Sequence, residues 1–195
     1  MSRIKRRTIP RAITAEAWLF TAMFVAAVWV YQSGIIAGIV SWTSSLGPLV
    51  GGLAAGAAFS TFITTPFAIA GFVEMGMRHT MPIWQIALGG AVGAAIVDIM
   101  LVKGIRSPLA LLLVRAVIGH ETETFKSRVR RKPASRWYAG LFGAFLIAIP
   151  LPTDELGVVF LGASGLNTLQ MVPIILAADF TGIYAIVSAA RALAG

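Results

Sequence analysis

Four carboxylic acids lie inside segments that are otherwise nearly free of charge, and these residues are the ones best suited to do chemistry. They are Asp98, Asp154, Glu155 and Asp179. A charged acid at the centre of a membrane helix costs about 2.5–3.5 kcal/mol on insertion scales, and such acids commonly mark ion or substrate pathways. Neighbouring carboxylates in a low dielectric cannot all ionise without a compensating proton or cation. The pattern therefore predicts a proton- or cation-coupling site built from these four residues.

Each acid also has a simpler interpretation. Asp98 lies four residues before the end of its apolar segment, so a snorkelling Lys103 or Arg106 could pair with it at the membrane interface. Asp154 and Glu155 would form a solvated loop if their segment turned at the surface. Asp179 would serve as a hydrogen-bond acceptor between helices. Both interpretations of each acid stay open at the level of sequence.

The composition indicates the medium in which these acids lie. Of the 195 residues, 57% are hydrophobic and 12% are charged, and the mean hydropathy is +0.83. A soluble domain carries about 25% charged residues. No charged side chain occurs from residue 17 to residue 73, a run that only a membrane requires. The sequence predicts an all-α integral membrane protein whose partners include membrane lipids.

The residue counts also exclude several kinds of site. The chain has no cysteine, and His79 and His120 are its only histidines. A thiolate or histidine metal cage therefore cannot form, and we expect neither a metal nor a cofactor. The net charge of +8 could suggest nucleic acid. Since the basic residues lie at the edges of apolar segments, the membrane explains them and no nucleic-acid partner is expected.

The apolar pattern divides the chain into membrane segments joined by polar stretches. A basic N-terminus (1–12) precedes the first segment. The segments are a transmembrane helix at 17–41, a Gly/Thr/Pro-interrupted segment at 46–76, a transmembrane helix at 81–102, an interfacial helix with a basic loop at 107–136, a Pro/acid-interrupted segment at 137–166, and a transmembrane helix at 167–190.

The distribution of charge predicts the topology. Fourteen of the sixteen basic residues lie in 1–12 and 103–136, which leaves Arg78 and Arg191. Basic loops stay in the cytoplasm. Both clusters are cytoplasmic only if the segment 46–76 enters and leaves the membrane on one side. We expect the chain to lie in a bacterial or archaeal inner membrane with both basic regions cytoplasmic.

A second hairpin at 137–166 would make the chain an inverted repeat. Each half would consist of a re-entrant hairpin followed by a transmembrane helix, with about three full spans in all. Broken elements of this kind meet near the midplane in many transporters. Whether 137–166 spans or re-enters stays open. The residues that would line a pathway at the two hairpin tips are Thr61, Thr64, Thr65, Pro66 and Pro152, although threonine hydroxyls more often bond to their own helix.

This pattern resembles the DedA family of membrane proteins, also known as the VTT-domain superfamily. The run Pro152 to Glu155 resembles the proline–acid hairpin tip of that family. The glycines from Gly89 to Gly93, with Asp98, Gly104 and Arg106, resemble its glycine-rich helix that ends in an acid and Gly-Arg. The acidic tip stands here in the second hairpin, where the family usually carries an arginine. The resemblance implies opposed hairpins and translocation of a lipid carrier or phospholipid with proton or ion coupling.

Three functions follow as expectations. The first is a small transporter of a lipid carrier, a phospholipid or a small solute. The second is an intramembrane enzyme that modifies lipids, and the third is a membrane scaffold or assembly factor. Residues 162–165 also match the GxSG of rhomboid proteases, but no histidine follows Ser164. Gly34 and Gly38, four residues apart, predict a close-packing helix face that would suit a homodimer.

Overall fold

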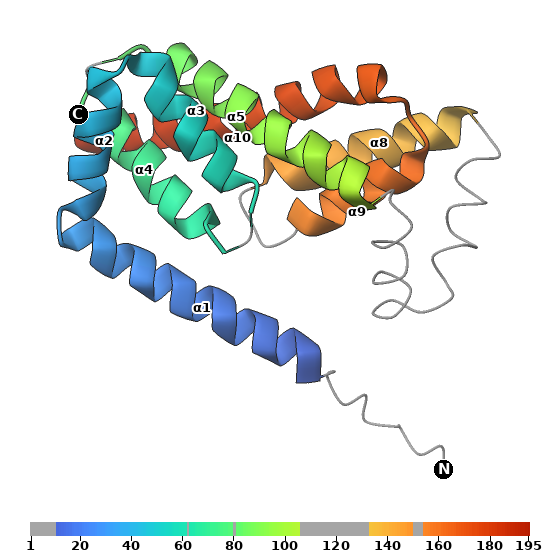
Figure 1. Cartoon of the computed structure of the whole chain (residues 1–195), viewed down its shortest axis with the longest axis horizontal. Coiled ribbons are helices and arrows are strands. Elements are labelled where there is room, and N and C mark those ends of the chain that lie inside the picture. Colours follow the sequence, from blue (N-terminus) through green and yellow to red (C-terminus); the bar gives the residue numbers. More distant parts are fainter. Residues whose placement is uncertain (1–10, 62, 80, 106–132, 150–153) are drawn as a thin grey trace.

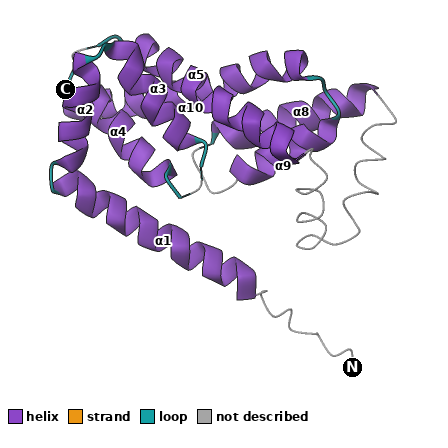
Figure 2. Ribbon diagram, in the orientation of Figure 1, coloured by secondary structure: helices purple, strands orange, loops and turns teal. Residues whose placement is uncertain are grey.

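All regular structure in the described part of the chain is helical (Figure 2). The computed structural model describes residues 11–61, 63–79, 81–105, 133–149 and 154–195 (Figure 1). Most of the interfacial stretch predicted at 107–136 lies outside these residues. The helices are α1 (Arg11–Gln32), α2 (Ile35–Ser45), α3 (Pro48–Phe59), α4 (Thr65–Met77), α5 (Ile83–Ile105), α8 (Pro133–Ala148), α9 (Asp154–Ser164) and α10 (Thr168–Ala194).

From α3 onward, length separates the helices into two classes. With 23 and 27 residues, α5 and α10 are about 34 and 40 Å long, enough to cross about 30 Å of hydrocarbon. The helices α3, α4, α8 and α9 have 12, 13, 16 and 11 residues, so the longest of them reaches about 24 Å. Two helices are thus long and apolar enough to span a membrane, or three if α1 and α2 together form one span.

The segment predicted as a transmembrane helix at 17–41 is broken. Residues Thr21–Gln32 and Ile35–Thr43 meet at an angle of 73°. Gly34 lies at the break with a φ of 80°, a conformation that glycine adopts without the steric cost of a Cβ. The expectation that Gly34 and Gly38 form one helix face is therefore wrong, because Gly34 lies outside both helices. A Cβ added at either glycine would meet nothing within 4 Å.

The short helices form two pairs, and each pair precedes a long helix. The first helix of each pair packs on the long helix that follows it, α3 on α5 and α8 on α10. The second helix of each pair packs on the other long helix, α4 on α10 and α9 on α5. In Figure 1 the two pairs approach the middle of the long axis from opposite ends. This reciprocal packing places the turn between α3 and α4, the end of α8 and the start of α9 near the centre.

Glycines allow the closest of these contacts. The backbone of α3 lies against that of α5 at Gly56, where an added Cβ would collide with the carbonyl group of Gly90. In the second pair, a Cβ at Gly143 or at Gly157 would lie 2.7 Å from the carbonyl oxygen of the other residue. Only glycine permits backbones to approach so closely.

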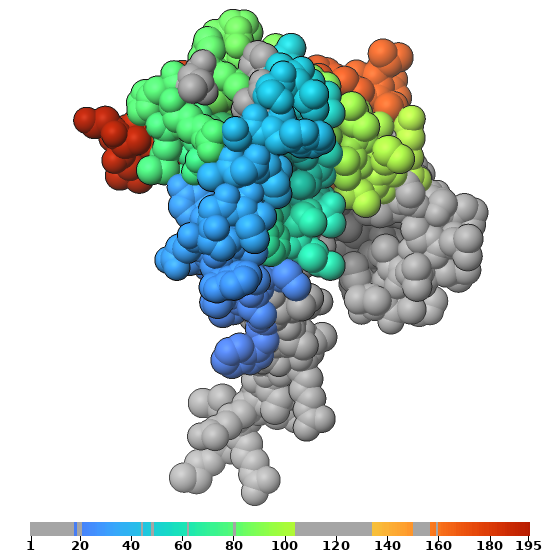
Figure 3. Space-filling model, turned by 60° about the vertical axis from the view of Figure 1, so that its left-hand side comes forward, coloured from blue at the N-terminus to red at the C-terminus, as the bar shows by residue number. Residues whose placement is uncertain are grey.

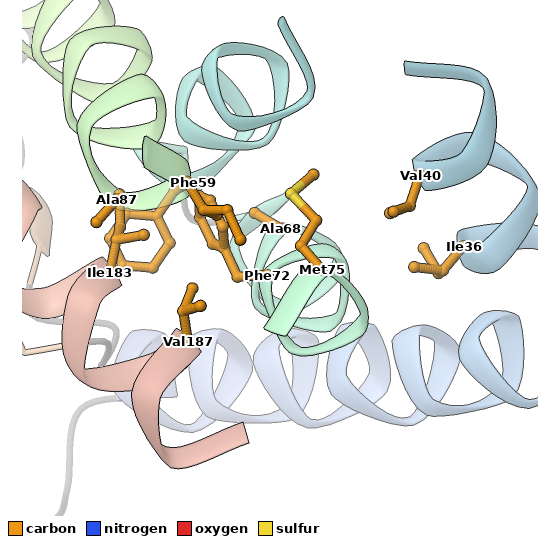
Figure 4. Packing of buried hydrophobic residues seen from close by; sticks show 10 residues of the cluster. Ile36, Val40, Phe59, Ala68, Phe72, Met75, Ala87, Ile183 and Val187 are labelled. Carbon is orange, nitrogen blue, oxygen red and sulfur yellow. The ribbon is translucent and has the colours of Figure 1, made fainter. Parts of the chain in front are cut away.

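The first core cluster lies where α2, α3, α4, α5 and α10 meet. Phe59 and Phe72 stand at its centre with their ring centroids 6.0 Å apart at 71°. Figure 4 shows Ile183 and Val187 of α10 on one side of these rings, while Ile36 of α2 lies on the other side. A second cluster joins the other halves of α5 and α10 to α8 and α9. Since the start of α5 shares the first cluster with the end of α10, the two long helices run antiparallel.

Large apolar side chains also cover much of the described surface. Trp18, Trp29, Trp42 and Tyr138 are among the exposed aromatic residues. The helix α1 stands out from the packed body in both Figure 1 and Figure 3, and in the described residues it packs only on α2 and α4. An apolar exterior around buried acids is the arrangement expected of a protein surrounded by lipid.

Candidate functional site

Asp98 is completely buried within α5, with 0% of its surface exposed. No described residue donates a hydrogen bond of normal geometry to either oxygen of its carboxyl group. Lys103, one of its two expected interfacial partners, forms no salt bridge with it, and Arg106, the other, lies outside the described residues. The structure thus corrects the interfacial interpretation, because α5 continues to Ile105 and turns Asp98 toward its neighbouring helices. A buried carboxyl group without donors is costly to ionise.

Asp179 is the second acid buried at mid-helix, with 1% of its surface exposed. It is the twelfth of the 27 residues of α10. Its helix packs on α4, α5 and α8. Three residues further along, a Cβ added at Gly182 would lie 2.6 Å from the carbonyl oxygen of Ala148. Asp179 is therefore one turn from the end of α8.

The antiparallel packing of α5 and α10 brings the two acids to nearly the same level. A Cβ at Gly90 would lie 2.9 Å from the Cδ1 atom of Ile183, so these two residues share one level. Asp98 lies eight residues beyond Gly90, whereas Asp179 lies four residues before Ile183. With a rise of 1.5 Å per residue, the two acids differ in height by about 6 Å, roughly one helical turn.

The turn between α3 and α4 reaches this level. The Ser60 hydroxyl donates to the carbonyl oxygen of Ala94 on α5 at 3.1 Å, one turn from Asp98. The hydroxyls of Thr64 and Thr65 instead bond within their own hairpin. The acceptors of these two residues are the carbonyl oxygens of Ala58 at 2.5 Å, Phe59 at 2.8 Å, and Thr61 at 3.2 and 2.8 Å.

These bonds give the predicted pathway residues a structural role. Thr64 and Thr65 satisfy carbonyls that the end of α3 would otherwise leave unpaired. Thr61 is exposed, and Pro66 is buried in the first turn of α4. Pro152 lies outside the described residues. Ser60 of this hairpin contacts α5 beside Asp98. It was not among the residues predicted from the sequence, because nothing there distinguishes it from its hydroxyl-bearing neighbours.

The helix pair α8–α9 also carries two acids, and they lie where α9 begins. Asp154 and Glu155 occupy the first turn of α9, and their side chains lie outside the described part. In Figure 1 the start of α9 and the end of α8 lie near the middle of the long axis. The structure thus gathers Asp98 and Asp179 at the centre and begins α9 nearby.

Described basic residues lie at the two ends of the helices and not at this centre. At one end, Arg191 donates to the carbonyl oxygens of Gly76 at 3.3 Å and Met81 at 2.5 Å. Arg78, at the same end, forms an ion pair with Glu74 at 2.8 Å. At the other end Arg136 donates to the carbonyl oxygen of Gly165. Asp98 therefore has no basic partner among the described residues.

The structure also places Ser164, the serine of the GxSG match. Ser164 is fully buried, donates to the carbonyl oxygen of Leu161 at 2.6 Å and accepts from the backbone N–H of Leu166 at 3.2 Å, so its hydroxyl caps α9 and is not placed as a nucleophile. The described residues contain no group of three or more metal-ligating side chains.

No family model, no curated protein and no solved structure matches this chain.

Proposed function

We propose that the chain is a small integral membrane transporter of a lipid carrier, a phospholipid or a small solute, coupled to protons or cations. The observation that carries this proposal is the pair of buried acids, Asp98 and Asp179, inside two long antiparallel helices, with the α3–α4 turn one helical turn from Asp98. Because a charge at such depth is costly, a proton or cation would accompany the Asp98 carboxyl group whenever it loses contact with water, and Asp179 would lie one helical turn away in level. Binding and release of that ion would provide the coupling.

The fold supports a pair of opposed re-entrant hairpins. Each of the four short helices is too short to cross the hydrocarbon alone. The two pairs make reciprocal contacts with α5 and α10, as expected of two halves related by inversion. The threonine hydroxyls of the first turn satisfy backbone carbonyls of α3, as a turn inside a membrane requires. These features agree with the DedA-like arrangement, which we retain as a proposal.

The positions of aromatic and basic residues support a proposed orientation of the protein in the membrane. Exposed Trp42 and Trp84 lie toward the end of the molecule that holds Arg191, and exposed Trp137 lies at the end that holds Arg136. Tryptophans favour both membrane interfaces. The helix α5 also ends toward Arg136, and the basic loop follows it in the sequence. We propose that this end faces the cytoplasm.

The proposed topology can be tested with single cysteines, since the chain has none of its own. We expect cysteines at positions 5 and 103 to react with a membrane-impermeant maleimide only from the cytoplasmic side. Cysteines replacing Met77 and Leu193, which are 42% and 88% exposed, should react only from the other side. Cytoplasmic labelling at 77 would show that the α3–α4 pair crosses the membrane. Cytoplasmic labelling at 193 would show the same for the α8–α9 pair.

Reconstitution tests the function itself. We expect the protein in phosphatidylethanolamine/phosphatidylglycerol liposomes to accelerate the transbilayer movement of an NBD-labelled phospholipid, read as dithionite-accessible fluorescence. An imposed proton or sodium gradient should change the rate. Protein-free liposomes and a gradient collapsed by ionophore are the controls. Movement that ignores both gradients would contradict coupling, and chemical conversion of the lipid would favour the enzyme.

A further inference from the structure

One hydroxyl at the first hairpin turn differs from its neighbours. Thr64 and Thr65 bond to carbonyls of their own hairpin, whereas Ser60 reaches out of the hairpin to the carbonyl oxygen of Ala94 on α5. Ser60 is only 6% exposed. Its hydrogen bond is therefore a direct polar link between the α3–α4 hairpin and a span.

The acceptor of this bond lies beside the buried acid. In an α-helix the carbonyl of residue 94 accepts the N–H of residue 98, so Ala94 and Asp98 share one turn of α5. The side chain of a helical residue lies over the turn that precedes it, so the Asp98 carboxyl group lies over the turn of Ala94, whose carbonyl oxygen accepts from Ser60 at 3.1 Å. The carboxyl oxygens receive no full hydrogen bond from described residues. A small shift of Ser60 would exchange one acceptor for the other.

The charge of Asp98 determines to which acceptor the Ser60 hydroxyl donates. A hydrogen bond to an ionised carboxylate is roughly twice as strong as one to a neutral carbonyl. When Asp98 is ionised, Ser60 should donate to its carboxylate. When Asp98 is protonated, its own O–H can donate to the Ser60 oxygen, and the Ser60 proton returns to Ala94.

We infer that Ser60 is a positioning residue that passes the charge state of Asp98 to the α3–α4 hairpin by exchanging its hydrogen bond between Ala94 and Asp98. This inference rests on the proposed function, since it names how the same site is regulated. It links proton or cation occupancy at a span to movement of a hairpin turn without requiring a second ionisable group on that hairpin.

Other charged groups on the elements packed against α5 define the necessary controls. The helix α3 carries no charged residue. The groups on the remaining elements are Asp179 and Arg191 on α10, Asp154 and Glu155 on α9, and Glu74 with Arg78 at the far end of α4. Of those with described side chains, Asp179 alone lies at the level of the turn. The experiment is therefore repeated with Asp179→Asn.

A fluorescent reporter on the hairpin turn tests the inference. Ile63, 50% exposed in the turn, is replaced by cysteine and labelled with an environment-sensitive dye in lipid nanodiscs. We expect the emission to change as the pH is raised from acid to alkaline. Ser60→Ala and Asp98→Asn should abolish the change. Ser60→Thr should retain it because the hydroxyl remains, and Asp179→Asn should retain it because Asp98 is intact.

A matched control separates this role from a merely structural one. Thr65→Val removes another buried hydroxyl of the same turn, one that bonds within the hairpin, and should leave the pH response intact. A full response in Ser60→Ala or in Asp98→Asn would overturn the inference, as would its loss in Thr65→Val with the fold preserved. The reporter needs no transport. If the wild-type protein shows the pH response but moves no lipid, only the proposed function is refuted. If Ser60→Ala keeps both the pH response and gradient-driven lipid movement, only this inference is refuted.

Discussion

Replacing either central acid by its amide should stop gradient-driven transport and leave the fold in place. We expect Asp98→Asn and Asp179→Asn to reduce gradient-dependent lipid movement in liposomes to the level of protein-free vesicles, because an amide cannot take up or release a proton. Both substitutions keep side-chain volume. Asp98 is already buried without a full hydrogen bond, so its substitution should change the free energy of unfolding by no more than about 1–2 kcal/mol.

The matched control is Glu74→Gln. It makes the same carboxylate-to-amide change at the end of α4, where Glu74 pairs with Arg78 and is partly exposed. A partly exposed ion pair contributes little, about 0–1 kcal/mol, and this one lies away from the proposed pathway. We expect transport close to wild type. Full gradient-driven movement in Asp98→Asn or Asp179→Asn would exclude that residue from coupling.

The close contact between α3 and α5 should make one glycine indispensable for stability. In Gly56→Ala the new methyl group would collide with the backbone of Gly90, which cannot rotate away as a side chain can. We expect the two helices to separate locally and the free energy of unfolding to fall by about 3 kcal/mol, at the upper end of typical overpacking costs. Thermal unfolding in detergent micelles, followed by circular dichroism, measures the loss.

Gly71→Ala provides the comparison for this substitution. Gly71 is also a buried helical glycine, but an added Cβ there would meet nothing within 4 Å. It borders an apolar cavity of about 230 Å³ between α2, α3 and α4. The methyl group should fit, and the higher helix propensity of alanine should add about 0.5–1 kcal/mol. Equal unfolding temperatures for the two variants would contradict the backbone contact at Gly56.

Local signals predicted much of the helical pattern. The interruptions at 60–66 and 150–155 predicted two broken segments, and the structure has a helix pair across each. The last helix was predicted to begin at residue 167, and Asn167 caps α10 there in a capping box. Its side chain accepts from the Gln170 N–H at 2.8 Å, while the Gln170 side chain accepts from the Asn167 N–H at 3.1 Å. Prolines and caps act on the backbone within one turn, so a single sequence reveals them.

Contacts between distant segments were harder to predict. Nothing in the sequence separates Gly34, where the chain bends, from Gly38, which lies in a helix, because the difference depends on what each helix packs against. The distance of Asp98 from the end of its segment indicated its depth but not the direction it faces. That direction is set by α3 and α10, and the contact with α10 joins residues some eighty positions apart. The opposed arrangement of the two hairpins stays a prediction.

The contact between α4 and α10 also has a consequence for biosynthesis. Gly76 receives its hydrogen bond from Arg191, 115 residues later in the chain, and Phe72 is buried in the cluster that contains Ile183 and Val187 of α10. At about 5–20 residues per second, a ribosome needs roughly 6–23 s to make the intervening chain. In the proposed topology, the α3–α4 pair lies in the bilayer during that interval without the helix that covers it. We therefore expect the insertion machinery to cover this pair until α10 emerges.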